Sequence, residues 1–254
     1  MTIALVRRPS PRLAEGLVTH IERTEIDLDL ARRQWSRYVD ALRNVGWVVQ
    51  EVPPLESAPD GVFVEDAVVM YRDVAIVTRP GAEVRRAETI GVEKVLSGIG
   101  CEVERIVAPG TLDGGDVLKV GDTIFIGLGG RTNQSGIDQF ARIVQPLGAT
   151  VVTVPVSKVL HLKSAVTALP DGTIIGWDPA VDDTSVFRRY HSMPEESGAH
   201  VVVIDARTVL MAADAPQSAR LLESFGYTVI RVDISEYQKL EGCVTCLSVR
   251  LRHR

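Results

Sequence analysis

Cysteine is scarce in this sequence: the 254-residue chain contains three. A small, odd number of cysteines does not predict a disulfide framework and is typical of reducing compartments, so we expect a cytoplasmic protein. Long apolar runs are also missing. Charged residues interrupt every apolar segment before it approaches the roughly 18 residues that a membrane helix requires. The N-terminus has no charged region ahead of its apolar part, which argues against a signal peptide.

An excess of basic residues is absent as well. The chain has 28 Lys and Arg against 33 Asp and Glu, and a net charge of −5. The basic residues are scattered rather than gathered on one segment. Nucleic acid and anionic membranes are therefore poor candidates as partners. What is present is ordinary for a globular protein, with 45% hydrophobic and 24% charged residues.

Three predicted β-hairpins recur at a constant interval. Their turns contain Asp73, Asp122 and Asp171, which are 49 residues apart in both steps. Such a repeat indicates units that bury their strands against neighbouring units. The three hairpins are predicted for residues 67–78, 117–127 and 165–176, and a fourth fits residues 200–211.

The remaining patterns complete these units. Helices are predicted for residues 27–44, 83–98, 133–146 and 216–224, and further strands for 2–7, 47–52, 102–107, 150–155, 227–232 and 245–251. The last of these is expected to pair with the first and close a fifth unit. We therefore predict one α/β domain, residues 1–254, with five strand–hairpin–helix units around a central cavity. An open mixed sheet with coincidental hairpin spacing is the alternative. Residues 10–24 show no periodicity and are expected to form a loop.

Polar residues occupy the loops that enter these hairpins. Asp66, Asp113 and His161 are spaced by 47 and 48 residues, close to the repeat itself. Equivalent loops of a ring face the same cavity, so these side chains are expected to meet Cys246 from the tail. Asp116 follows two glycines and is an alternative acid, or a residue that caps the backbone of the turn.

This set of residue types has a coherent chemistry. A thiolate at Cys246 is a strong nucleophile, and His161 can transfer protons. A carboxylate bonded to the other ring nitrogen would fix the tautomer of the imidazole. A further carboxylate requires a cation, and a planar guanidinium with paired N–H donors suits it.

The two tail cysteines have other readings. Cys243-x-x-Cys246 resembles half of a redox or zinc site, but a redox motif should open a helix, and the residues after Cys246 alternate like a strand. A structural zinc site needs four ligands, and His253 is the nearest candidate in sequence. Cys101 enters a strand and is expected to be structural.

Together these residues identify a family. The chain resembles the dimethylarginine dimethylaminohydrolases, guanidine-modifying enzymes of the pentein β/α-propeller group, over essentially its whole length. The resemblance is carried by Asp60-Gly-Val-Phe-Val-Glu-Asp66, Thr78-Arg-Pro-Gly-Ala-Glu-Val-Arg-Arg86, Ala108-Pro-Gly-Thr-Leu-Asp-Gly-Gly-Asp116, Arg131-Thr-Asn, Val159-Leu-His-Leu-Lys-Ser164, Ser235-Glu-Tyr and Gly242-Cys-Val-Thr-Cys-Leu-Ser248.

The resemblance implies roles for individual residues. Cys246 matches the nucleophile, His161 the general acid and base, and Asp113 the acid that supports the histidine. The implied substrate-binding residues are Asp66 as the guanidinium-binding acid, with Glu65 and Asp60 also in the substrate site, Arg85 and Arg131 at the α-carboxylate, and the backbones of Leu17 and Leu240 at the α-amino end. No cofactor is implied. An inhibitory zinc ion on Cys246 and His161 is conceivable, and so is a homodimer.

The implied reaction is hydrolysis of Nω-methylated arginine to citrulline and an alkylamine through a covalent thiouronium on Cys246. Related arginine deiminases place a carboxylate two residues after the histidine, where this chain has Lys163, which favours a methylated substrate. An arginine deiminase or amidinotransferase, or a guanidine- or zinc-binding protein without activity, are the alternatives. Cys243 is unusual for the family and suggests a reversible disulfide with Cys246.

Overall fold

The computed structural model describes residues 2–252, whose strands form five sheets of three strands each. The sheets are β15-β1-β2, β3-β4-β5, β6-β7-β8, β9-β10-β11 and β12-β13-β14. In every sheet the middle strand pairs antiparallel with one neighbour and parallel with the other. Four units are thus a hairpin followed by a crossover to a third, parallel strand, and in the fifth the antiparallel partner of β1 is β15 from the other end of the chain.

The strands are β1 (Thr2–Val6), β2 (Val48–Glu51), β3 (Val68–Tyr71), β4 (Val74–Val77), β5 (Glu102–Arg105), β6 (Val117–Val120), β7 (Thr123–Leu128), β8 (Thr150–Pro155), β9 (Val166–Ala168), β10 (Ile174–Gly176), β11 (Tyr190–Ser192), β12 (Val201–Val203), β13 (Thr208–Ala212), β14 (Thr228–Val232) and β15 (Val249–Arg252). The α-helices are α1 (Leu28–Asn44), α2 (Val92–Gly98), α3 (Gln134–Val144), α4 (Pro216–Ser224) and α5 (Ser235–Gln238).

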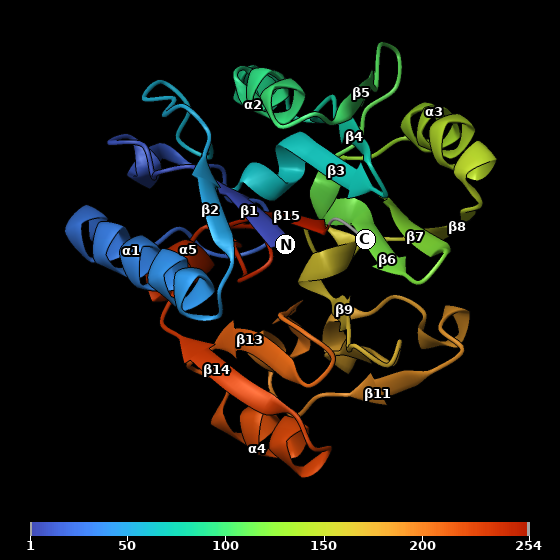
Figure 1. Cartoon of the computed structure of the whole chain (residues 1–254). Coiled ribbons are helices and arrows are strands. Elements are labelled where there is room, and N and C mark those ends of the chain that lie inside the picture. The colour runs from blue at the N-terminus through green and yellow to red at the C-terminus, as the bar shows by residue number, and fades with distance from the viewer. Residues whose placement is uncertain (1, 253–254) are drawn as a thin grey trace.

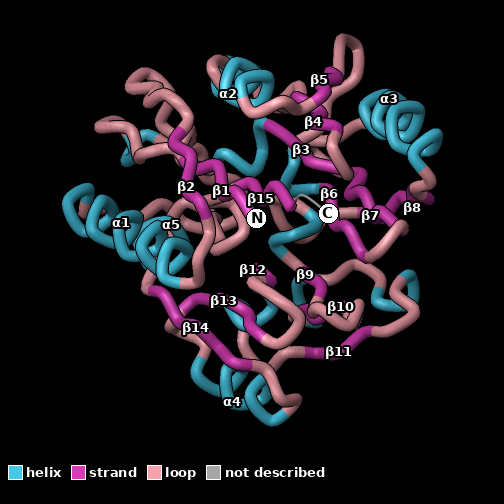
Figure 2. Tube along the Cα trace, viewed as in Figure 1, coloured by secondary structure: helices cyan, strands magenta, loops and turns pink. Residues whose placement is uncertain are grey.

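The arrangement is a ring (Figure 1). Helices α1, α2, α3 and α4 lie at the periphery, and the inner strands β3, β6, β9, β12 and β15 surround the centre (Figure 2). Parallel neighbours need such crossovers, because a tight turn cannot join them. The predicted five-unit β/α-propeller fold is confirmed. That the whole chain, 1–254, is one domain stays a prediction. No helix within residues 2–252 is long and apolar enough to cross a membrane.

Helix α1 shows how sequence produces one of these outer elements. The Asp27 side chain accepts a hydrogen bond from the Leu30 amide at 2.9 Å and so caps the first turn. The apolar stripe that predicted the helix, including Trp35, Tyr38 and Leu42, is buried against the ring. The predicted bounds, 27–44, agree with the structure.

The helix predicted for residues 83–98 was wrong as a single element. A 3-10 helix covers Glu83–Thr89, and α2 begins only at Val92. Gly91 separates them with a φ of 82°, in the left-handed region that an α-helix cannot contain. The apolar periodicity of the sequence continues across Gly91, so the pattern predicted one continuous helix.

The tail strand is shorter than predicted. It starts at Val249 rather than Thr245, and pairs antiparallel with β1 as expected, with Leu5 opposite Val249. The preceding residues form turns, closed by bonds from the Cys246 amide to the Cys243 carbonyl at 3.1 Å and from the Ser248 amide to the Thr245 carbonyl at 3.4 Å. Cys246 therefore lies in a turn that feeds the closing strand.

Candidate active site

Three short 3-10 helices lead into the hairpins of consecutive units and contact one another near the centre of the ring: η2 (Val64–Ala67), η4 (Gly114–Asp116) and η6 (Leu162–Ser164). Asp66 lies within the first, and Asp113 and His161 directly precede the other two. The repeat thus brings side chains together that are far apart in sequence, as predicted.

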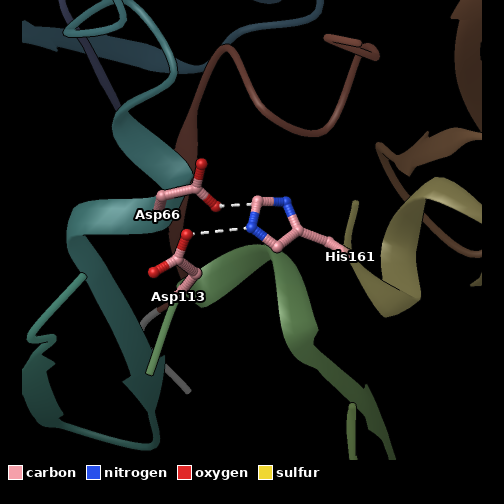
Figure 3. A group of neighbouring side chains, drawn as sticks. All are labelled: Asp66, Asp113 and His161. Atoms are coloured by element: carbon pink, nitrogen blue, oxygen red, sulfur yellow. Dashed lines mark hydrogen bonds and ion pairs between the residues drawn. The ribbon is translucent and has the colours of Figure 1, made fainter. Parts of the chain in front are cut away.

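His161 lies between two carboxylates (Figure 3). Its Nε2 is 2.9 Å from Asp113 Oδ2, and its Nδ1 is 3.9 Å from Asp66 Oδ1. Burial lowers the pKa of the imidazole, but the charge of Asp66 and the hydrogen bond to Asp113 outweigh it and raise the pKa to about 9. His161 is therefore an imidazolium at neutral pH in the substrate-free site.

Gly115 makes this close approach feasible. Its amide donates to Asp66 Oδ1 at 2.8 Å. A Cβ at this position would lie 2.5 Å from His161 Nδ1 and 2.8 Å from Asp66 Oδ1, so a side chain would displace both groups. The Gly114-Gly115 pair was the available signal in the sequence, and sequence reasoning gave it no role in the site.

Asp66 belongs to a buried ion pair. Arg85 Nη1 donates to Asp66 Oδ2 at 2.8 Å, and the other edge of the guanidinium binds Glu88 at 2.9 and 2.7 Å. Burial raises the pKa of Asp66, but the charges of His161 and Arg85 outweigh this and lower it to about 2. The Arg85 guanidinium is therefore occupied by protein carboxylates, and the role predicted for it at a substrate carboxylate requires this pairing to change. Glu88 was missed by sequence reasoning.

Arg131 offers a donor that the described residues leave unused. Its Nη1 is buried, makes no hydrogen bond within residues 2–252, and lies 3.9 Å from Asp113 Oδ2. Its Nη2 makes one long bond, 3.4 Å, to the hydroxyl of Thr19. Because buried donors are nearly always paired, an anionic oxygen from a ligand fits this position.

Asp60 holds the early loop against the site. Both of its carboxylate oxygens accept the Leu17 amide, each at 3.1 Å. Burial raises the pKa of Asp60 and outweighs the charge of Arg85 and the hydrogen bond from Leu17, which lower it. Leu240 is buried on the same side. The structure thus brings Leu17, Asp60 and Leu240 to the site, while their roles toward a substrate stay predictions.

Glu65 does not face the same space. Its Oε1 binds Lys163 at 2.6 Å and Arg250 at 2.8 Å. Neither Glu65 nor Lys163 lines the cavity that eight of the predicted site residues share, and Asp113 does not line it either. The Oε2 of Glu65 is buried and makes no hydrogen bond within residues 2–252, and a direct contact of the Glu65 carboxylate with substrate stays a prediction.

The shared cavity is closed. Eight of the predicted site residues line it: Leu17, Asp60, Asp66, Arg85, Arg131, His161, Leu240 and Cys246. Its volume is about 10 Å³, room for roughly one water molecule. Glu241 holds the early loop over it by accepting the amides of Thr19 at 2.5 Å and His20 at 2.9 Å. A ligand the size of arginine can enter only if this loop moves.

The two tail thiols lie side by side. Cys246 Sγ lines the closed cavity, and Cys243 Sγ is 3.3 Å from it and faces a neighbouring cavity of about 390 Å³. The hydrogen bond with Cys243, burial, and the charges of Glu65 and Asp66 raise the pKa of the Cys246 thiol. The same hydrogen bond lowers the pKa of Cys243 to about 5, because Cys246 can donate to its thiolate.

Two other sequence readings can be placed. Asp116 caps the backbone: its oxygens accept the Leu162 amide at 2.9 Å and the Thr132 hydroxyl at 2.6 Å. Among residues 2–252, the group able to supply metal ligands within 4.8 Å of one another is Asp66, Asp113 and His161. Cys246 is not part of it, so zinc on Cys246 and His161 stays a prediction, and His253 lies outside the described residues.

Comparisons with known proteins show which family the chain belongs to. No family model matches the chain. An N(G),N(G)-dimethylarginine dimethylaminohydrolase of Streptomyces coelicolor is 63% identical over 249 residues, covering 98% of this chain and 96% of that protein. The enzyme of the same name from Pseudomonas aeruginosa is 36% identical over 97% of this chain and 98% of its own length.

Solved structures give the same result. A cysteine-to-serine variant of the Pseudomonas aeruginosa enzyme in complex with citrulline superposes with a TM-score of 0.91 at 35% identity, covering 98% of both chains. A histidine-to-glycine variant bound to S-methyl-L-thiocitrulline gives a TM-score of 0.92 at 35% identity, covering 98% of this chain and 99% of that one. The N-terminal domain of ArgZ, an arginine dihydrolase, shares the fold at 18% identity with a TM-score of 0.85. The chain belongs to the dimethylarginine dimethylaminohydrolase family.

Proposed function

We propose that this protein hydrolyses Nω,Nω-dimethyl-L-arginine and Nω-monomethyl-L-arginine to L-citrulline and the corresponding methylamine. The observation that carries the proposal is the shared cavity, in which the Cys246 thiol, the His161 imidazolium and the Asp66 carboxylate face one small space. These are a nucleophile, a proton donor and a cation-binding acid, the groups that substitution at a guanidinium carbon requires.

The nucleophile is activated by the substrate. The hydrogen bond with Cys243, burial, and the charges of Glu65 and Asp66 keep the pKa of the Cys246 thiol high. A guanidinium bound beside Asp66 brings a positive charge next to the thiol, which lowers that pKa and favours the thiolate. The thiolate that attacks the guanidinium carbon and forms the covalent intermediate is therefore favoured by substrate binding itself.

His161 performs both proton transfers. As an imidazolium it donates a proton to the departing dimethylamine, and the neutral ring then accepts a proton from the water that attacks the thiouronium. Asp113 bonds Nε2 at 2.9 Å and is itself held by the Gly81 amide at 2.9 Å. This leaves Nδ1 facing the cavity side, toward Asp66.

The apolar lining favours methylated nitrogen atoms. Phe63 and Leu160 line the cavity, and Lys163, two residues after the histidine, is tied to Glu65 instead of offering a carboxylate. A methylated nitrogen has lost N–H donors, so a carboxylate there would be left without a partner. The unused Nη1 of Arg131 supports a role for this residue in binding the α-carboxylate.

A comparison of substrates tests this proposal. We expect kcat/KM for dimethylarginine and monomethylarginine to exceed that for arginine by at least about 100-fold, and agmatine, which has no carboxylate for Arg131, to be a poor substrate. Citrulline and dimethylamine would be quantified together. Equal or faster turnover of arginine would indicate a deiminase. Transfer of the amidino group to an amine acceptor would indicate an amidinotransferase. Tightly bound zinc together with no turnover would indicate a binding protein without activity.

The Asp113→Asn variant should shift the pH dependence of activity. The pKa of His161 is raised above its ordinary value, so the proton donor is present at neutral pH and lost as the pH rises through about 9. Removing the Asp113 charge should move the basic limb of the pH profile of kcat/KM to lower pH, by roughly one to two pH units. Asp138→Asn, a charge removal on the exposed face of α3, is the control and should leave the limb in place. An unshifted limb in Asp113→Asn would separate Asp113 from the titration of His161.

We further propose a cytoplasmic location, because the small number of cysteines, all free, suits a reducing compartment. A homodimer remains a hypothesis that light scattering on the purified protein tests directly.

A further inference from the structure

A second, larger cavity opens at the axis of the ring. It has a volume of about 670 Å³ and is lined by residues of the inner strands of all five sheets, β3, β6, β9, β12 and β15. Neither Cys246 nor His161 lines it. Figure 2 shows these strands around the centre of the ring. The cavity is therefore an axial space distinct from the closed active-site cavity.

Its lining is strongly cationic. Five positive side chains reach it, Arg72, Lys119, Lys163, Arg250 and Arg252, against two carboxylates, Asp73 and Asp122. The chain as a whole carries a net charge of −5, so this concentration of positive charge is local. A concave, partly enclosed surface of one sign focuses its field and concentrates counter-ions.

Two of these cations lack an acidic partner within residues 2–252. Lys119 Nζ donates to the Met70 carbonyl at 2.5 Å, and Arg252 Nη2 donates to the Val203 carbonyl. A carbonyl oxygen satisfies a hydrogen-bond donor but does not neutralise its charge. The carboxylate of Glu65 pairs with two other cations of the lining, Lys163 and Arg250.

The uncompensated charge affects Lys119 itself. The Lys119 side chain is exposed to this cavity rather than packed in the core. Desolvation there and the positive charges of Arg250, Lys163 and Arg252 lower its pKa, and Glu65 offsets this only in part. The remaining charged groups at this end of the cavity are Arg72, Asp73 and Asp122, and Arg72 lies 3.8 Å from Asp122. A bound anion would favour the ammonium form and raise this pKa, so binding near neutral pH should take up a proton.

We infer that the axial cavity is a binding site for a small multivalent oxyanion of the phosphate class, held chiefly by Lys119 and Arg252. The site is independent of the proposed hydrolysis, because none of its residues carries the chemistry. A tetrahedral dianion matches this lining, because it offers several oxygen acceptors to a lysine ammonium and to the paired N–H donors of an arginine guanidinium.

Titration calorimetry at low ionic strength, with sulfate as the probe, tests the site. Sulfate does not titrate near neutral pH, so proton uptake measured in two buffers of different ionisation enthalpy belongs to the protein. The wild-type chain should bind one sulfate saturably, with net proton uptake at pH 7. Lys119→Met should weaken binding by at least about tenfold and abolish the uptake, and Arg252→Gln should weaken binding while retaining the uptake.

Lys94→Met is the matched control, because Lys94 is exposed on the peripheral helix α2. This variant should bind sulfate as the wild type does. Turnover without added anion should be equal in Lys119→Met and wild type. Inorganic phosphate and a phosphate monoester compared with sulfate would show whether free phosphate or a phosphorylated small molecule is preferred. Absence of saturable sulfate binding, or an equal loss in Lys94→Met, would overturn the assignment.

Discussion

Cys246→Ser is expected to lose turnover by a factor on the order of 10⁴ or more, because a serine hydroxyl is a far weaker nucleophile at a guanidinium carbon. The substitution changes one atom in a buried turn, so the fold should persist. Substrate should still bind, since Asp66, Arg131 and Asp60 remain. Production of citrulline from dimethylarginine, together with binding measured by calorimetry, separates the lost chemistry from the retained recognition.

Cys101→Ser is the matched control for that variant. Cys101 is a free thiol outside the active-site cavity, and the same change of atom there should leave kcat within about twofold. A Cys246→Ser protein that kept measurable covalent turnover would assign the nucleophile elsewhere, and Cys243, whose sulfur is 3.3 Å away, would be the next group to test.

Hydrogen peroxide is expected to inactivate the wild-type enzyme completely and reversibly. The sulfur atoms of Cys243 and Cys246 are 3.3 Å apart, so a short movement forms an S–S bond, with both thiol hydrogens leaving as two waters formed from the peroxide. Thiol reductant should restore activity, and mass spectrometry should find the loss of two hydrogen atoms in the peptide that contains both cysteines.

Cys243→Ser should convert this reversible inactivation into an irreversible one. Without a partner thiol, oxidised Cys246 proceeds from sulfenic to sulfinic acid, which thiol reductants do not reverse. Cys101→Ser should behave like the wild type. If Cys243→Ser recovered with reductant as fully as the wild type, a protective disulfide between the two tail cysteines would be ruled out.

Sequence patterns predicted the fold well where they reflect local geometry. The hairpin turns containing Asp73, Asp122 and Asp171 are present, and α1 has its predicted bounds. The patterns failed where a single backbone conformation interrupts an apolar stripe, as at Gly91. No α-helix lies between β10 and β11, and the sequence patterns predicted none there.

The site could be predicted in part. The repeat located Asp66, Asp113 and His161, and the structure brings them together. Partners that depend on the third dimension could not be read from spacing. Glu88 pairs with Arg85, and Lys163 and Arg250 pair with the Glu65 carboxylate. Motif resemblance transfers residue identities, but the pairing of buried charges is decided by packing.

The pairing of β1 with β15 has a consequence for how the enzyme assembles. Residues 2–6 and 249–252 are neighbours in one sheet, so this sheet has the largest sequence separation of any pairing in the ring. Such contacts carry the highest loop-closure cost and form late in folding. During synthesis the first strand must wait for the last one, and the turn that holds Cys246 is ordered by that same closure. The reactive thiol would therefore reach its position only when the ring is complete, which ties maturation of the active site to completion of the fold.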